Sequence, residues 1–163
     1  MTNKLTRMSV LTAAALILHI VEAQLPPLVP IPGVKLGLAN IITVYAIFRF
    51  TPKETFMILF VRILLGSIFA GSLTALLFSA CGGLFCYLCM LIMRKIVNEK
   101  QIWVCSVFGS AAHNTGQMLA ALALYQSYSV LVYLPLLMLS GIICGLFTGL
   151  CVQAVIKRLD GIL

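Results

Sequence analysis

The chain has 163 residues, of which 62% are hydrophobic and only 9% are charged, and its mean hydropathy is +1.13. A soluble fold of this size could not keep so much apolar surface from water. Eleven basic and four acidic residues give a formal charge of +7, which in a membrane protein indicates topology rather than nucleic-acid binding. The composition therefore largely excludes a soluble enzyme, a disordered chain and a nucleic-acid binder, and it predicts one integral membrane domain over residues 1–163.

Apolar runs that could cross a bilayer, which takes about 20 residues, begin near the N-terminus. The first predicted helix covers residues 8–24. Residues 25–34 hold four of the six prolines, and because proline breaks helices we expect a loop there. A short helix is predicted over 35–50. The segment Thr51-Pro52-Lys53-Glu54 then marks a helix start, with Thr51 at the N-cap and Glu54 at the third position of a capping box.

The run from residue 53 to residue 94 is too long for one crossing. Its 42 residues would form a helix of about 63 Å, twice the roughly 30 Å hydrocarbon core. We expect the chain to fold back between Gly66 and Ser72, which gives helices over 53–69 and 73–97. The uncharged stretch 101–156 breaks at the polar residues 126–129, which gives helices over 101–125 and 131–157. The sequence thus predicts an all-α bundle of six transmembrane helices.

The basic residues predict the orientation of this bundle. If both termini and the loops near residues 51 and 98 are cytoplasmic, nine of the eleven basic residues lie inside, only Lys35 lies outside, and Arg62 lies within a helix. This is a strong positive-inside pattern. We therefore expect a multi-pass protein of the cytoplasmic membrane with cytoplasmic N and C termini. The nine residues are Lys4, Arg7, Arg49, Lys53, Arg94, Lys95, Lys100, Lys157 and Arg158.

Catalytic and cofactor motifs are missing from the sequence. The four acidic residues are scattered, so no carboxylate pair can hold the magnesium that prenyl and phosphoryl transfer generally need, and there is no Walker A motif. Cys86 and Cys89 form a CxxC without the further ligands that zinc requires. We expect a protein that is not an enzyme and that holds no cofactor and no metal.

Polar side chains at membrane depth are costly, so each is a functional candidate. His19 and Glu22 are three residues apart and share a helix face, as do His113 and Gln117, which are four apart. In the predicted topology these and other polar groups lie between mid-membrane and the outer surface, which predicts a ligand cavity open to the outside. The candidate ligand-binding residues are His19, Glu22, Lys35, Asn40, Arg62, His113, Asn114 and Gln117.

Structural interpretations of these residues stay open. Arg62 could form a buried ion pair with Glu22, and Lys35 could be an interfacial anchor. The residues from His113 to Gln117 could simply join helices through hydrogen bonds. The last predicted helix also carries a stripe of small residues, which indicates close helix packing; its members are Gly141, Gly145 and Gly149.

Two segments resemble a known family. Residues 32–40 (PGVKLGLAN) resemble the PG-x-K-L-G-L-A-N segment of the Gx transporter family, also labelled heptaprenyl diphosphate synthase component I. Residues 106–117 (SVFGSAAHNTGQ) resemble its S-x-x-G-A-x-A-H-N-x-G-Q segment, with Ser110 in place of the usual alanine. Arg62 and the pair Gly82-Gly83 also fit, and the resemblance covers roughly residues 8–157.

The resemblance implies a function and partners. The family is similar to the S components of energy-coupling-factor transporters, which are bacterial six-helix proteins that bind vitamins on the outer side. This implies a subunit that captures a small molecule, vitamin-like or an isoprenoid or quinone precursor, and works with a membrane coupling subunit and two ATPases. The alternative is an accessory subunit without transport, which assists isoprenoid or quinone metabolism or flavin-linked electron export beside a prenyl synthase or flavoprotein.

Overall fold

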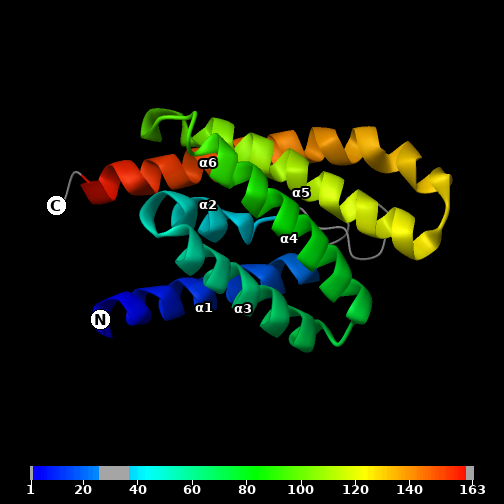
Figure 1. Ribbon diagram of the computed structural model, residues 1–163, viewed down its shortest axis with the longest axis horizontal. Coiled ribbons are helices and arrows are strands. Elements are labelled where there is room, and N and C mark those ends of the chain that lie inside the picture. Colours follow the sequence, from blue (N-terminus) through cyan, green and yellow to red (C-terminus); the bar gives the residue numbers. More distant parts are fainter. Residues whose placement is uncertain (1, 26–36, 161–163) are drawn as a thin grey trace.

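The computed structural model describes residues 2–25 and 37–160, and within these residues the chain forms helices and no strand (Figure 1). The expected all-α architecture with six main helices is therefore confirmed for this part of the chain. Lys35 and most of the predicted loop lie outside the described residues. The helices are α1 (Thr2–Gln24), α2 (Asn40–Arg49), α3 (Pro52–Ala70), α4 (Leu73–Met93), α5 (Ile102–Tyr125) and α6 (Leu134–Asp160), with short 3-10 helices η1 (Glu99–Gln101) and η2 (Tyr128–Tyr133).

The start and end of α3 follow from local sequence. Thr51 and Glu54 form the predicted capping box, in which the Thr51 N–H donates to Glu54 Oε2 at 3.0 Å. The Lys4 ammonium, 2.7 Å from Glu54 Oε1, and this N–H hold the pKa of Glu54 below its ordinary value. The helix ends at Gly71, whose φ of +59° is in the left-handed region that glycine tolerates. Ser72 then caps α4 by accepting the N–H of Ala75, so the chain folds back where the sequence predicted.

Other boundaries differ from the predicted ones. Helix α1 begins at Thr2 rather than at residue 8, because the polar residues before residue 8 are also helical. Among them, Lys4 forms an ion pair with Glu54. Helix α2 begins at Asn40 rather than at residue 35, because Gly37 has a φ of +86° that no α-helix accepts. Helix α4 ends at Met93 rather than at residue 97. Helix α6 begins at Leu134 rather than at residue 131, directly before Pro135, which lacks an N–H and suits a first helical turn.

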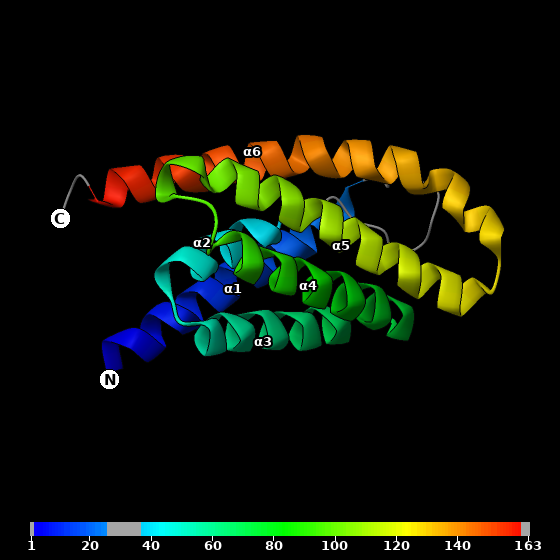
Figure 2. The same ribbon diagram turned by 45° about the horizontal axis from the view of Figure 1, so that its top comes forward.

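Helices α4, α5 and α6 lie side by side (Figures 1 and 2). Glycines allow this close approach. A Cβ added at Gly116 of α5 would lie 2.6 Å from the backbone oxygen of Cys81 in α4. The three glycines of the α6 stripe all face α5. A Cβ added at Gly141 would meet the Asn114 side chain. A Cβ added at Gly145 would lie 2.8 Å from Ser110 Oγ, and one added at Gly149 would lie 2.5 Å from Trp103 Cα.

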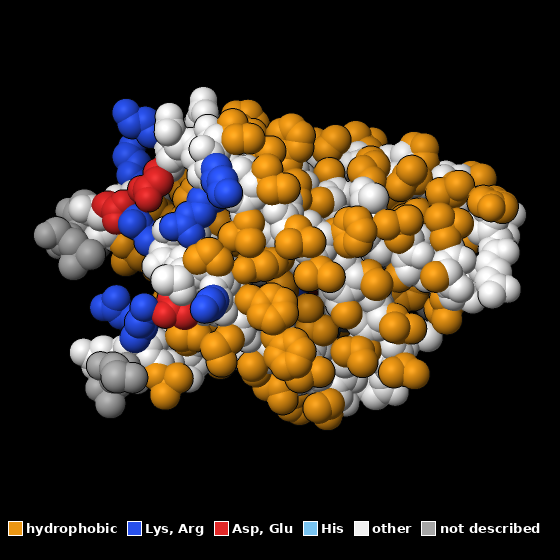
Figure 3. All heavy atoms as spheres, in the orientation of Figure 1, with side chains coloured by type: hydrophobic (Ala, Val, Ile, Leu, Met, Phe, Trp, Pro, Cys, Tyr) orange, Lys and Arg blue, Asp and Glu red, His pale blue; other side chains and the backbone are white. Residues whose placement is uncertain are grey.

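The outer surface is apolar along most of the molecule, and Lys and Arg side chains gather at the end where both termini lie (Figures 1 and 3). Asn3–Gln24, Leu73–Met93 and the continuous stretch Tyr128–Asp160 are each long and apolar enough to cross a membrane. Among the residues that the structure describes, two ion pairs join helices at the charged end, Lys4 with Glu54 and Arg49 with Asp160. These features are compatible with a membrane protein.

Candidate ligand pocket

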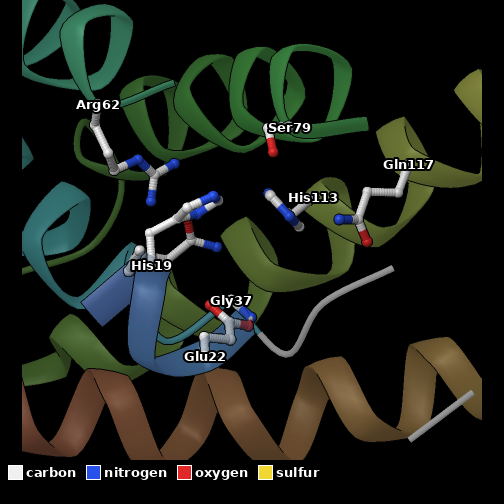
Figure 4. A pocket seen from close by; sticks show the side chains of 9 residues that line it. His19, Glu22, Gly37, Arg62, Ser79, His113 and Gln117 are labelled. Carbon is white, nitrogen blue, oxygen red and sulfur yellow. Dashed lines mark hydrogen bonds between the residues drawn. The ribbon is translucent and has the colours of Figure 1, made fainter. Parts of the chain in front are cut away.

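A small polar pocket lies among α1 to α5 (Figure 4). It contains about 280 Å³ of unfilled space, counting the part that is open to the outside. Its enclosed part has room for only about one or two water molecules. The pocket is lined by His19, Glu22, Gly37, Ala39, Asn40, Arg62, Ser79, His113 and Gln117.

Helices α1 and α3 supply one wall of the pocket. His19 and Glu22 share a face of α1, and both line the pocket. The Glu22 carboxylate accepts the backbone N–H of Gly37, which fixes the start of the turn before α2. Gly66 of α3 lies against His19, because an added Cβ there would be 2.8 Å from His19 Cδ2. Arg62 precedes Gly66 by one helical turn and therefore faces the same space.

Helices α4 and α5 supply the opposite wall. His113 and Gln117 project from one face of α5 toward Gly82 of α4 (Figure 4). A Cβ added at Gly82 would lie 2.8 Å from His113 Cε1 and 2.9 Å from Gln117 Cγ. The glycine therefore makes the space that these two side chains occupy. Ser79 lies three residues before Gly82, on the same face of α4.

Unpartnered polar atoms are concentrated in this pocket. Buried polar atoms in proteins are nearly always hydrogen-bonded. Among the described residues, five buried side-chain polar atoms have no partner in normal hydrogen-bond geometry, and four of them line the pocket. Their side chains are at most 6% exposed. The four atoms are Asn40 Oδ1, Arg62 Nε, His113 Nδ1 and Gln117 Oε1, and the fifth is Gln153 Oε1.

Arg62 is buried within the bundle, at 4% exposure. The ion pairs between described residues lie at the charged end, and neither includes Arg62. The direct Arg62–Glu22 ion pair that the sequence left open is therefore not formed between the described side chains.

The structure brings together six of the eight candidate residues and separates a seventh. Asn114 Nδ2 donates to the backbone oxygen of Leu137 in α6, so Asn114 joins two helices and does not line the pocket. Lys35 lies outside the described residues. Sequence reasoning missed Gly37, Ala39 and Ser79. The position of Ser79, one turn before Gly82 in an otherwise apolar helix, is a signal that could have identified it.

No metal-binding arrangement accompanies the pocket in the described part of the chain: no three His, Cys, Asp or Glu side chains there are grouped to hold an ion. The fold and the pocket define an all-helical protein with an apolar exterior and a polar interior site, compatible with a membrane protein.

The chain belongs to the family described as heptaprenyl diphosphate synthase component I, which matches residues 11–155. This confirms the family resemblance predicted from the sequence. No curated protein and no solved structure matches the chain.

Proposed function

We propose that the chain is an S-component-like membrane subunit that captures a small molecule from the outer side for uptake with a separate ATPase module. The observation that carries this proposal is the polar pocket, which is built from five helices or their adjoining turns. The apolar exterior supports a position within the bilayer. By the positive-inside rule we expect the charged end to face the cytoplasm, and we take the pocket to open toward the outer side.

Six crossings are part of this proposal. Helix α3 carries Lys53, Glu54 and Arg62, and α5 carries His113, Asn114 and Gln117, so their average composition is less apolar than that of α4. Arg62 and the three α5 residues are buried inside the bundle, where lipid does not contact them. Helix α2 has ten residues and covers only about 15 Å, so its crossing depends on the residues before Asn40.

We expect both termini and the turns near residues 51 and 98 to face the cytoplasm. Single cysteines at Thr51, Asn98 and Ser127, placed in a variant without the six native cysteines, should report this in intact cells. A membrane-impermeant maleimide should label position 127 and spare positions 51 and 98 until the cells are opened. Labelling of position 98 in intact cells would show that the orientation is wrong.

Co-purification tests the transport proposal. The full-length chain, tagged and extracted in mild detergent, should bring down a membrane coupling subunit and a pair of ATPases. The chain has no nucleotide-binding motif of its own, so its binding of the transported molecule should not require ATP. Recovery of the chain without any ATPase, in conditions that preserve other membrane complexes, would contradict this function.

A second candidate function follows from the family description, which implies association with a prenyl synthase. In that case the chain would be an accessory membrane subunit, and the same purification would recover a prenyl synthase or a flavoprotein in place of ATPases. The two functions differ in which protein accompanies the chain, so one experiment separates them.

The isolated chain should not condense isoprenoid diphosphates. The prenyl-transfer reaction generally needs paired carboxylates for magnesium, whereas Glu54 and Asp160 are each engaged with a cation at the charged end. Incubation of the purified chain with magnesium and radiolabelled allylic and homoallylic diphosphates should yield no longer prenyl product. Metal-dependent product formation that persists through repeated purification would refute this expectation.

A further inference from the structure

We infer that the ligand of the pocket is a small heterocycle with an amide N–H and an anionic or carbonyl acceptor, rather than an isoprenoid diphosphate. The inference rests on the proposed function, in that it takes the pocket as the capture site. The unpartnered polar atoms indicate this ligand class, because each of them specifies what a ligand must offer at that place.

Two of the four atoms require donors. Asn40 Oδ1 and Gln117 Oε1 are amide oxygens, which only accept hydrogen bonds. Their side chains are each 2% exposed, so bulk water cannot serve them. A fully ionised diphosphate offers acceptors only and would leave both oxygens unsatisfied. Leaving a buried polar group without a partner is costly, so these two residues select for a ligand that carries N–H or O–H groups.

Of the other two atoms, one requires an acceptor and the other can be served by a donor or an acceptor. Arg62 Nε is a donor, and it is part of a cation that favours a carboxylate or carbonyl oxygen. His113 Nδ1 is a donor or an acceptor depending on its tautomer, and it lies between Arg62 and Gln117 (Figure 4). A ligand that satisfies the set must combine donors and acceptors. A ring amide does this, because its N–H and C=O are adjacent.

The lining of the pocket argues against a prenyl chain. Of the nine lining residues, only Gly37 and Ala39 lack a polar side chain. A prenyl group would therefore meet mainly polar side chains, and it would bury their polar atoms without partners. The enclosed part of the pocket is also small, with room for only about one or two water molecules, so only a compact polar group can reach the four atoms. Both features favour a compact polar molecule.

A panel of four probes tests the inference on the purified full-length chain in lipid nanodiscs. The probes are 6-oxo-1,6-dihydropyridine-3-carboxylate, which has a ring amide and a carboxylate, benzoate, benzamide and geranyl diphosphate. Binding is measured by saturation-transfer NMR and by thermal stabilisation. We expect the ring-amide carboxylate to bind about tenfold more tightly than benzoate, because one further buried hydrogen bond has about that effect. Geranyl diphosphate should not compete with it.

Matched variants assign the preference to the pocket. Gln117→Met keeps the length of the side chain and removes its amide, so it should reduce the tenfold preference to nearly one while benzoate binding stays unchanged. Gln153→Met is the control, because Gln153 also has an unpartnered amide oxygen but does not line the pocket. That variant should keep the full preference.

The outcomes separate the two proposals. Equal or tighter binding of benzoate or geranyl diphosphate, abolished by Arg62→Met, would overturn the ligand class and leave the capture site standing. If none of the probes binds and Gln117→Met changes nothing, the four atoms are served by buried water only and the inference is wrong. The transport proposal is decided independently by the ATPase co-purification.

Discussion

Replacing Gly116 by alanine should destabilise the bundle by about 2 kcal/mol or more, the upper part of the range for overpacking a core. The added Cβ would lie 2.6 Å from the Cys81 backbone oxygen and 3.0 Å from Gly82 Cα. Both neighbours are backbone atoms of α4, so no flexible side chain can move aside and the two helices must separate. Thermal unfolding of the purified chain in detergent, followed by circular dichroism, measures the loss.

Gly83→Ala is the matched control for this prediction. Both substitutions favour the helix by about 1 kcal/mol through intrinsic propensity, and both positions are within helices. At Gly83, however, the nearest atom to an added Cβ is Ile63 Cδ1 at 2.8 Å, which is the flexible end of a side chain. This variant should unfold within a few degrees of the parent. If the two variants were equally stable, the direct backbone contact between α4 and α5 would be wrong.

Replacing Arg62 by methionine should leave the fold intact and weaken binding of the ring-amide carboxylate by at least tenfold. Hydrogen bonds to charged groups contribute about 1.5–3 kcal/mol, which corresponds to roughly 10- to 150-fold in affinity. The fold should survive because Arg62 has no ion pair among the described residues, and methionine replaces a costly buried charge with an apolar group of similar length. Isothermal titration of both forms in nanodiscs measures the change.

Two further variants distinguish a ligand-binding role of Arg62 from a structural one. Arg7→Met removes an exposed cation on α1 and should change neither stability nor binding. Glu22→Gln should be tolerated if Arg62 serves the ligand. A different pattern, in which Arg62→Met fails to fold and Glu22→Gln in the same chain restores folding, would return Arg62 to a purely structural role as the partner of Glu22.

Much of the fold could be predicted because the signals are local. Three helix boundaries are set by residues at the boundary itself. They are the capping box at Thr51 and Glu54, the turn at Gly71 and Ser72, and the polar break near residue 126. The face shared by His113 and Gln117 also follows from helical periodicity alone.

The rest depends on contacts between distant segments. Asn114 follows His113 directly, so it points about 100° further around α5 and meets α6 instead of the pocket. Periodicity separates the two faces but does not tell which neighbour each one meets. The start of α2 depends on the backbone of Gly37, which Glu22 holds from fifteen residues earlier. No local pattern in the sequence contains that contact.

The glycine contacts between α4, α5 and α6 have a consequence for the kinetics of ligand exchange. Because Gly116 brings two backbones into direct contact, the wall formed by Ser79, His113 and Gln117 cannot yield. Helix α1 packs against α3 and α2, and we expect it to be the wall that moves when a molecule enters. Association and dissociation would both be set by the frequency of that displacement. A side chain added at Gly66, where α3 supports His19, would displace His19 and should therefore change the affinity as well as the two rate constants.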